Sequence, residues 1–319
     1  MPSRAYHYLF GPVPSRRLGR SLGIDPVPSK TCSYNCIYCQ LGPTPSPTDE
    51  RREWVPVDAI LEEFGDWLEE DGQANVITIS GSGEPCLHIR LGEIIEGIQS
   101  LLAEKELEKK PDVCVLTNGS LLFLAEVRQD LMQADIVKAT FSAASDETWQ
   151  KVHGPASGIS YADMVAGLRL FAKEFSGQLW IEVMLMAGIN DDEDEVRKIA
   201  ALLADIQPNR IQLNTPVRPP AQSTARAVEP ERLEQLAAFF TPHAETPGAF
   251  RKKEASQRIL TEDEIAQMID RHPATAEQIA EAFGQDRAKV VSMLDTLVSQ
   301  NRIERIEDQG KVFYRIRQK

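Results

Sequence analysis

Apolar residues along this chain follow two alternating spacings. Short runs rich in β-branched residues, which favour buried strands, are separated by longer segments in which apolar positions recur every three or four residues, as on one face of a helix. The strand-like runs are 22–25, 76–80, 113–117, 136–141, 179–186 and 210–214. The helix-like segments are 57–70, 91–109, 121–133, 161–175, 191–205 and 230–240. The pattern therefore predicts six strands that alternate with helices.

Strands that alternate with helices form parallel sheets through right-handed crossovers. Six units are fewer than a complete eight-stranded barrel requires, so the pattern predicts an α/β fold with a partial (β/α)6 TIM-like barrel. A doubly wound open sheet is the alternative. In both architectures ligands bind beyond the carboxyl ends of the strands, so the residues that follow each strand are the candidates for a site.

The alternation covers residues 1–245, and the pattern then changes. A polar segment at 246–260 predicts a linker, and residues 261–319 predict a small separate domain. Three short helices are expected there, the second opened by a capping box at Thr275 and the third capped by Asp286. Two strand-like runs follow the helices. Three helices and a hairpin predict a winged helix-turn-helix domain.

The charge of the chain narrows the function classes. Its 319 residues include 48 Asp and Glu against 35 Lys and Arg, for a net charge of −13. This balance disfavours a broad surface for nucleic acid or for an anionic membrane. No stretch approaches the ~18 consecutive apolar residues of a membrane helix, and the first residues lack the apolar core of a secretory signal. We therefore expect a soluble, cytoplasmic protein that contacts no membrane.

Three of the five cysteines stand in a C-x3-C-x2-C run formed by Cys32, Cys36 and Cys39. An odd number of thiols on so short a segment does not fit a disulfide framework. Structural zinc sites close their shell with four protein ligands, whereas a cluster that performs chemistry keeps one position open. The run therefore predicts a [4Fe-4S] cluster whose fourth iron is open to a small molecule. The alternative is a zinc loop completed by a distant residue such as His88 or His153.

Further candidate residues follow the predicted strands. The turn at 80–85 contains two glycines, which let the backbone approach a ligand closely. Asn118, Ser142 and Asn190 also follow predicted strands. Each has an alternative interpretation: a plain turn at Asn118, a structural serine at Ser142, and a helix cap at Asn190 or Asp191. The candidates for cofactor binding are Tyr38, Gly81, Ser82, Gly83, Glu84, Asn118, Ser142, Ile189 and Asn190.

Four other residues near these positions have weaker assignments. Lys138 is either a contact for a carboxylate or a solvated lysine, and Arg218 follows the last strand as an anion partner for the substrate. Cys86 is either a ligand or redox group of the site or a small buried thiol. Cys114 stands in the middle of a strand and predicts a core residue.

A basic group precedes the cysteine run. It consists of Arg16, Arg17 and Arg20, surrounded by glycines and prolines. Solvated surface residues are one interpretation. The other is an ordered lid that holds a phosphate-bearing substrate.

The cysteine run, with Tyr38 just before its last cysteine, resembles the signature of the radical S-adenosylmethionine (SAM) enzymes. The turn at 80–85 is similar to the Gly-Gly-Glu-Pro element of that family, with Ser82 in place of its first glycine. The resemblance implies that the three cysteines hold a [4Fe-4S] cluster and that the amine and carboxylate of SAM chelate the fourth iron. It further implies that an electron cleaves the sulfonium to give a 5′-deoxyadenosyl radical.

The same resemblance implies roles for the residues after the strands. The turn, through its backbone and Glu84, would receive the methionine amine. Asn118 would meet the carboxylate or the ribose of SAM, and Ser142 the ribose. The backbone near Ile189 and the side chain of Asn190 would face the adenosine.

The sequence around the cysteines also resembles one branch of the family. Gly-Pro-Val-Pro-Ser-Arg-Arg before the run and Tyr-Cys-Gln-Leu-Gly at its end look like the proteins related to tRNA wyosine synthetase. Those synthetases carry further upstream cysteines for a second cluster that handles pyruvate, and no cysteine precedes Cys32 here. We therefore do not expect the wyosine reaction.

The prediction is a radical SAM enzyme that cleaves SAM reductively and abstracts hydrogen from RNA, a peptide or protein, or a small molecule. A flavodoxin or ferredoxin would supply the electron. The winged helix is expected to bind protein, peptide or nucleic acid, although its third helix begins with only Arg287 and Lys289 as basic residues. The alternative is an iron–sulfur redox-sensing transcription regulator that binds DNA through the winged helix; a zinc scaffold is a third.

Overall fold

The structure, a computed structural model, describes residues 6–15, 18–70, 72–105, 107, 109–247, 260–271, 273–308 and 310–317. Two predictions lie outside these residues. They are the basic pair Arg16 and Arg17 and most of the linker at 246–260.

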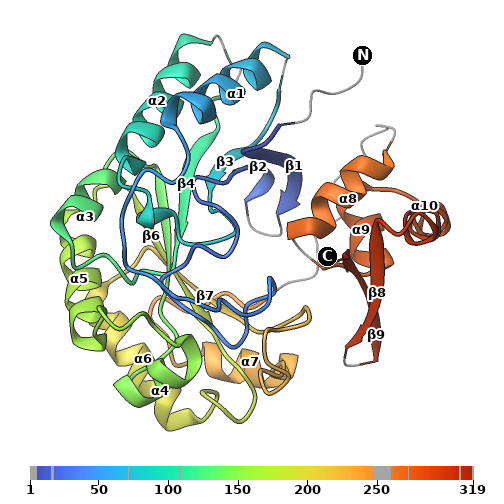
Figure 1. Cartoon of the computed structure of the whole chain (residues 1–319). Coiled ribbons are helices and arrows are strands. Elements are labelled where there is room, and N and C mark those ends of the chain that lie inside the picture. The colour runs from blue at the N-terminus through green and yellow to red at the C-terminus, as the bar shows by residue number, and fades with distance from the viewer. Residues whose placement is uncertain are drawn as a thin grey trace.

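A seven-stranded sheet forms the centre of the molecule, and its strands follow one another in chain order (Figure 1). β2 to β7 are parallel, and β1 adds to one edge in the antiparallel direction. The six predicted strands are all found. The strands are β1 Leu9–Ser15, β2 Gly19–Ile24, β3 Val76–Ile79, β4 Asp112–Thr117, β5 Ile136–Thr140, β6 Gln178–Met184 and β7 Arg210–Asn214.

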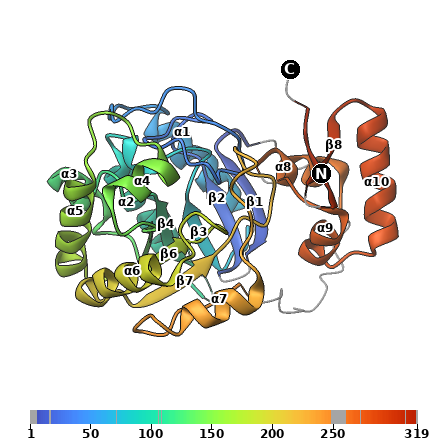
Figure 2. The same cartoon turned by 90° about the horizontal axis from the view of Figure 1, so that it is seen from below.

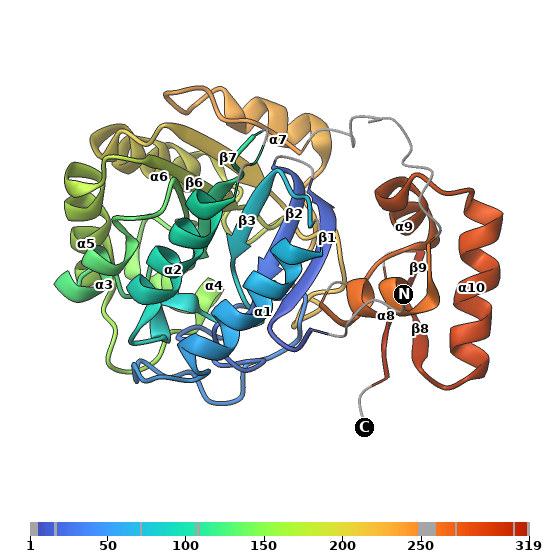
Figure 3. The same cartoon turned by 90° about the horizontal axis from the view of Figure 1, so that it is seen from above.

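Helices connect the parallel strands, and α1, α2, α3, α5 and α6 cover the outer face of the curved sheet (Figures 2 and 3). This arrangement is the partial barrel that the alternation predicts. The helices of this part are α1 Val57–Glu69, α2 Leu91–Glu104, α3 Ala125–Leu131, α4 Asp146–His153, α5 Tyr161–Glu174, α6 Glu193–Ile206 and α7 Pro230–Ala237, with a 3₁₀ turn, η1, at Pro85–Leu87.

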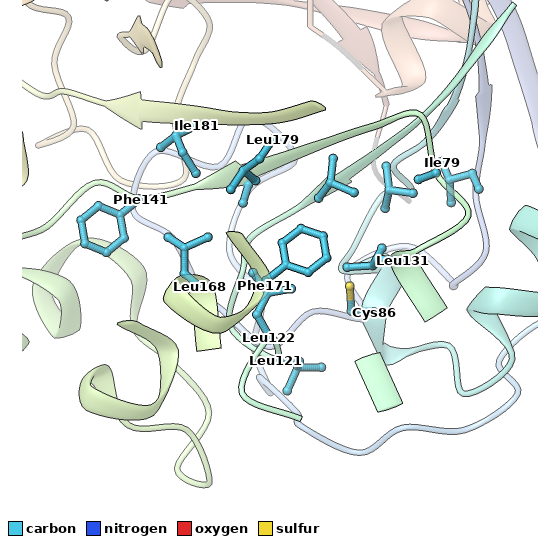
Figure 4. Close-up of a cluster of buried hydrophobic side chains, with 14 of the residues drawn as sticks. Ile79, Cys86, Leu121, Leu122, Leu131, Phe141, Leu168, Phe171, Leu179 and Ile181 are labelled. Atoms are coloured by element: carbon cyan, nitrogen blue, oxygen red, sulfur yellow. The ribbon is translucent and has the colours of Figure 1, made fainter. Parts of the chain in front are cut away.

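A hydrophobic core lies between the sheet and the helices, and it explains why the strand sequences are continuous apolar runs. Leu179 and Ile181 of β6 pack with Leu168 and Phe171 of α5, and all four are at most 4% exposed (Figure 4). Each such side chain contributes roughly 1.5–3 kcal/mol when it leaves water. The outer face of the sheet therefore carries the stability of the barrel, and its carboxyl ends are left for the site.

Two elements depart from the sequence prediction. β1 contains Pro12 and Pro14, which cannot donate ladder hydrogen bonds, but an edge strand tolerates proline. Its pairing with β2 shifts register between Phe10 and Val13. α4 was not predicted because it is short and mostly polar, with only Trp149 and Val152 as buried apolar residues.

The C-terminal part, residues 260–317 as described, has its own small core. Its elements are α8 Glu262–Arg271, α9 Ala276–Phe283, α10 Arg287–Ser299, β8 Ile303–Asp308 and β9 Lys311–Ile316. The capping box at Thr275 and the cap at Asp286 are present as predicted. α8 and α9 contact β1, so this part covers the antiparallel edge of the sheet (Figure 2). Within the described residues no helix is long and apolar enough to cross a membrane.

Candidate functional site

The cysteine loop follows β2 and lies against α4. The amide of Asn35 donates to the carbonyl of His153 (2.8 Å), and the amide of Ile37 donates to that of Val152 (3.0 Å). Gly154 ends α4 with φ +49°, and a Cβ there would lie 3.3 Å from the carbonyl oxygen of Asn35. The loop is therefore fixed by a helix that is more than a hundred residues away in the sequence.

Cys32, Cys36 and Cys39 are free thiols and half-buried. Burial raises the pKa of Cys32 to about 12 and that of Cys36 well above its ordinary value, so without a cation these thiols stay protonated. Bound iron reverses this because a metal deprotonates a coordinating thiol. No three described His, Cys, Asp or Glu side chains are arranged to hold a single metal ion. The donor set fits a cluster in which each thiolate binds a different iron.

The turn at 80–85 lies directly on the cysteine loop. The amide of Lys30 donates to the carbonyl of Ser82 (2.8 Å), and that of Glu84 donates to the carbonyl of Thr31 (2.9 Å). A Cβ on Gly83 would lie 2.0 Å from the Thr31 oxygen, so only glycine fits. Gly81 has φ +70°, which glycine adopts without strain. The structure thus brings the two motifs together through their backbones.

The Glu84 carboxylate is buried (1% exposed) and binds the chain itself. Oε1 accepts from the hydroxyl of Thr117 (2.7 Å) and the amide of Cys86 (3.0 Å), and Oε2 accepts from the amide of Asn118 (2.7 Å). Burial raises the pKa of Glu84. This carboxylate ties the turn to the end of β4, and its direct contact with an amine stays a prediction.

Asn118 joins the end of β4 to the cysteine loop. Its Nδ2 donates to Ser33 Oγ (2.8 Å) and lies 3.7 Å from Cys32 Sγ. Its Oδ1 accepts from the amide of Ser120, whose hydroxyl pairs with Ser33 Oγ (2.7 Å). Asn118 is therefore more than a turn residue, because its amide lies within hydrogen-bonding distance of a cysteine sulfur.

Tyr38 and Ile189 pack against the same small cluster, although 151 positions separate them in the chain. Both pack against a small apolar cluster that contains Ile37, Val152 and Met186. Desolvation raises the pKa of the Tyr38 phenol well above its ordinary value. This apolar cluster includes Ile37 of the cysteine loop, so apolar side chains lie on one side of that loop.

The side chains of Ser142 and Asn190 form hydrogen bonds with the backbone at the ends of two strands. The Asn190 side chain is fully buried; its Nδ2 donates to the carbonyls of Ser142 (2.8 Å) and Met184 (2.9 Å), and its Oδ1 accepts from the amide of Met186 (2.8 Å). Ser142 Oγ accepts from the amide of Met184 (2.9 Å). The two side chains clamp the ends of β5 and β6, and their contacts with SAM stay predictions. Neither Asn190 nor Asp191 caps α6, because Asp192 does.

Asn190→Asp should destabilise the protein by about 3 kcal/mol, because a carboxyl would face two carbonyl oxygens in a buried site. Asp191→Asn is the matched control, since the Asp191 side chain accepts a bond from the backbone amide of Gly188 (2.7 Å) and an asparagine oxygen can accept the same bond. The free energy of unfolding of Asp191→Asn should stay within about 0.5 kcal/mol of the wild type. Urea unfolding of the metal-free proteins measures both, and equal stabilities would contradict the clamp.

Lys138 is neither solvated nor available as a lone cation. Its Nζ lies 2.5 Å from Glu182 Oε1, and the side-chain Nδ2 of Asn214 donates to the same oxygen (3.3 Å). Arg218 donates to Gln40 Oε1 (2.8 Å), beside Cys39, and so ties the loop after β7 to the cysteine loop.

The remaining candidate residues are either buried or distant from the cysteine loop. Cys86 is buried, with Sγ 3.4 Å from Thr117 Oγ1, and Cys114 lies in the core with Trp180, as predicted. His88 is buried, and its Nε2 bonds the carbonyl of Val55 (2.8 Å). Arg20 is near the amino end of β2, whereas the cysteine loop follows the carboxyl end. The lid that it would form with Arg16 and Arg17, which lie outside the described residues, stays a prediction.

Two residues that contact the cysteines had no role in the cluster prediction. Lys30 Nζ lies 3.5 Å from Cys39 Sγ, and His153 Nδ1 lies 3.3 Å from Cys36 Sγ. A single lysine in a loop gives no sequence signal. His153 entered only as a distant zinc ligand, because no periodicity places α4 beside the cysteines.

Comparison with known proteins agrees with this geometry. A profile of the Radical SAM superfamily matches residues 27–202. A Brachyspira hyodysenteriae protein named GTPase Obg is 35% identical over 312 residues, which are 97% of this chain and 45% of that protein. A Helicobacter pylori UPF0026 protein is 34% identical over 273 residues, which are 85% of this chain and 86% of that one.

Among solved structures, Streptococcus suis SuiB bound to S-adenosylmethionine is similar over 70% of this chain and 49% of its own, with a TM-score of 0.51 and 13% identity. At this identity the likeness concerns the fold alone. This chain thus spans less than half the length of the Brachyspira protein and of SuiB.

Proposed function

This chain belongs to the radical SAM superfamily, and on that premise we propose that it binds a [4Fe-4S] cluster through Cys32, Cys36 and Cys39. It is an enzyme of the radical SAM class, a class that uses this cluster together with SAM. When bound, the two cofactors supply a 5′-deoxyadenosyl radical, which abstracts hydrogen from the substrate.

One observation carries the proposal: the turn at 80–85 lies on the cysteine loop with two backbone hydrogen bonds and no room for a Cβ at Gly83. Such contact fixes the distance between the thiols and the backbone oxygens of the turn. A ligand of the fourth iron would therefore meet a preformed set of acceptors for its amine. The Glu84 carboxylate connects that turn to the end of β4 through its hydrogen bonds with Thr117 and Asn118.

The other residues of the site are proposed to position the bound ligand and to exclude water from it. Asn118 connects the end of β4 to the cysteine loop at Cys32, and the apolar cluster against which Tyr38 and Ile189 pack would exclude water from one side. Ser142 and Asn190 fix the ends of β5 and β6, where the adenosine would lie. Exclusion of water protects a radical from side reactions, which is the contribution of the protein when a cofactor supplies the chemistry.

The proposed domain organisation is a radical SAM partial barrel at 1–245, a linker at 246–260 and a winged helix-turn-helix at 261–319. Three helices, a hairpin and a separate core support the last assignment. Its proposed role is to hold a protein or peptide substrate beside the barrel.

The alternative, a DNA-binding regulator, finds less support in the charges of this domain. Five arginines among its described side chains already pair with a carboxylate or an amide oxygen, and the counterion-driven part of DNA binding needs cations that can reach phosphates. The pairs are Arg287–Glu277, Arg302–Asp263, Arg305–Asp295, Arg315–Glu304 and Arg317–Asn301.

Electron paramagnetic resonance tests the proposal. The chain is reconstituted anaerobically with iron and sulfide, reduced with dithionite, and measured with and without SAM. We expect a reduced-cluster signal whose g values change when SAM is added, because SAM then ligates one iron. A signal that is identical in saturating SAM would contradict an open fourth iron.

A further inference from the structure

Each cysteine of the run has one side-chain nitrogen close to its sulfur, two of them from distant segments and one from the start of the same loop. The three nitrogens belong to an amide, an imidazole and an ammonium group. The pairs are Asn118 Nδ2 with Cys32 Sγ at 3.7 Å, His153 Nδ1 with Cys36 Sγ at 3.3 Å, and Lys30 Nζ with Cys39 Sγ at 3.5 Å.

These nitrogens are held by further contacts. Asn118 Nδ2 also donates to Ser33 Oγ (2.8 Å), and Lys30 Nζ donates to the carbonyl of Gly42 (2.5 Å). The ring of His153 is buried and packs between two aromatic rings, with centroid distances of 4.9 Å to Tyr34 and 5.8 Å to Tyr38. Their positions therefore follow from the fold rather than from chance contacts of mobile side chains.

The three donors differ in charge and exposure. Lys30 is the only one with a full positive charge, and it is half-buried. His153 is 2% exposed, and its Nδ1 also lies 3.5 Å from the Tyr38 hydroxyl; we assign the proton to Nδ1, which makes His153 a neutral donor to Cys36. Asn118 is a neutral amide. No described carboxylate is paired with Lys30 by a hydrogen bond or ion pair.

We propose that Lys30, His153 and Asn118 donate N–H···S hydrogen bonds to the three cysteine sulfurs of the bound cluster and set its reduction potential, with Lys30 as the principal residue. Reduction adds one electron and one negative charge to the cluster. Donors to the sulfurs stabilise that extra charge, and a nearby cation does so most strongly. Lys30 is thus a positioning and tuning residue, not a ligand.

This proposal deepens the proposed function and rests on its cluster. Its consequence is that the donors raise the reduction potential and allow a weaker physiological reductant to load the electron. Removal of the cation should therefore make the cluster harder to reduce without removing it. That separates the effect from the loss of a ligand.

The test is an anaerobic redox titration of the reconstituted full chain, followed by electron paramagnetic resonance. Lys30→Met should lower the equilibrium constant for reduction about tenfold, which is 59 mV for a one-electron couple. Lys30→Arg keeps a cationic donor and should stay within about threefold of the wild type. Lys198→Met, an exposed site on α6, is the control for loss of one charge and should not change the potential. Equal potentials for Lys30→Met and the wild type would overturn the proposal.

A second measurement covers the case in which Lys30→Met fails to assemble a cluster. Wild-type chain labelled with ¹⁵N-lysine is reconstituted and reduced, and electron-nuclear double resonance looks for a ¹⁵N coupling. We expect the coupling in the wild type and its loss in Lys30→Arg. Its absence from the wild type would overturn the proposal. If the wild type assembles no cluster at all, the proposed function itself fails, so the two failures are distinguishable.

Discussion

Replacement of Cys36 by alanine removes the cluster and, with it, SAM cleavage. The expected iron content after reconstitution falls far below about four per chain, and 5′-deoxyadenosine formation falls more than about 100-fold, beyond the 10–100-fold that loss of an outer-shell partner of a metal ligand typically costs. The reason is the proposed donor set: three thiols on one loop would hold three irons, and no other described thiol is placed to substitute. Iron and sulfide analysis with product chromatography measures both.

Two other cysteines provide matched controls. Cys114→Ala removes a core thiol beside Trp180, which should cost about 1 kcal/mol of stability and leave iron and product unchanged. Cys86 lies much closer to the site, but its Sγ contacts Thr117 Oγ1 of β4, so Cys86→Ala should also retain the cluster. If Cys36→Ala kept its iron while Cys86→Ala lost it, the assignment of ligands would be wrong.

Replacement of Gly83 by alanine has the second large effect. The added Cβ would lie 2.0 Å from the carbonyl oxygen of Thr31, so the turn must move away from the cysteine loop by more than about 1 Å. Displacements of that size cost about 100-fold in rate when they alter how a ligand is positioned. We expect 5′-deoxyadenosine formation to fall by that factor and the free energy of unfolding to fall by about 3 kcal/mol.

Gly65→Ala is the control for Gly83→Ala. Gly65 lies in α1, and a Cβ there meets no atom within 4 Å. Alanine should raise the free energy of unfolding by about 0.5–1 kcal/mol, since it favours helix over glycine, and should leave SAM cleavage unchanged. Full activity in Gly83→Ala would show that the contact between turn and loop does not position SAM.

Local sequence was sufficient wherever short-range chemistry decides the structure. The β-branched runs of β3 and β4 are buried on both faces, and the capping box at Thr275 needs only four consecutive residues. The cysteine run was recognisable because its three ligands share one loop. The same holds for the turn at Gly83, whose glycines mark a close backbone approach.

Contacts between distant segments were beyond the reach of sequence patterns. His153 lies 117 residues from Cys36, and α4 brings them together although its own sequence is too polar to predict a helix. Asn190 could be recognised as a polar residue after a strand, but not as the clamp between β5 and β6. β1 was missed because its prolines disfavour a strand everywhere except at an edge.

The most direct test of the central claim is the formation of 5′-deoxyadenosine by the wild-type chain. The protein is reconstituted anaerobically, its cluster is confirmed by absorbance and iron content, and SAM and dithionite are added in excess. We predict that 5′-deoxyadenosine and methionine appear in equal amounts, depend on both reductant and SAM, and are absent from Cys36→Ala. A protein with a full complement of iron, bound SAM and a reduced cluster that forms no 5′-deoxyadenosine would contradict the assignment of this site to SAM cleavage.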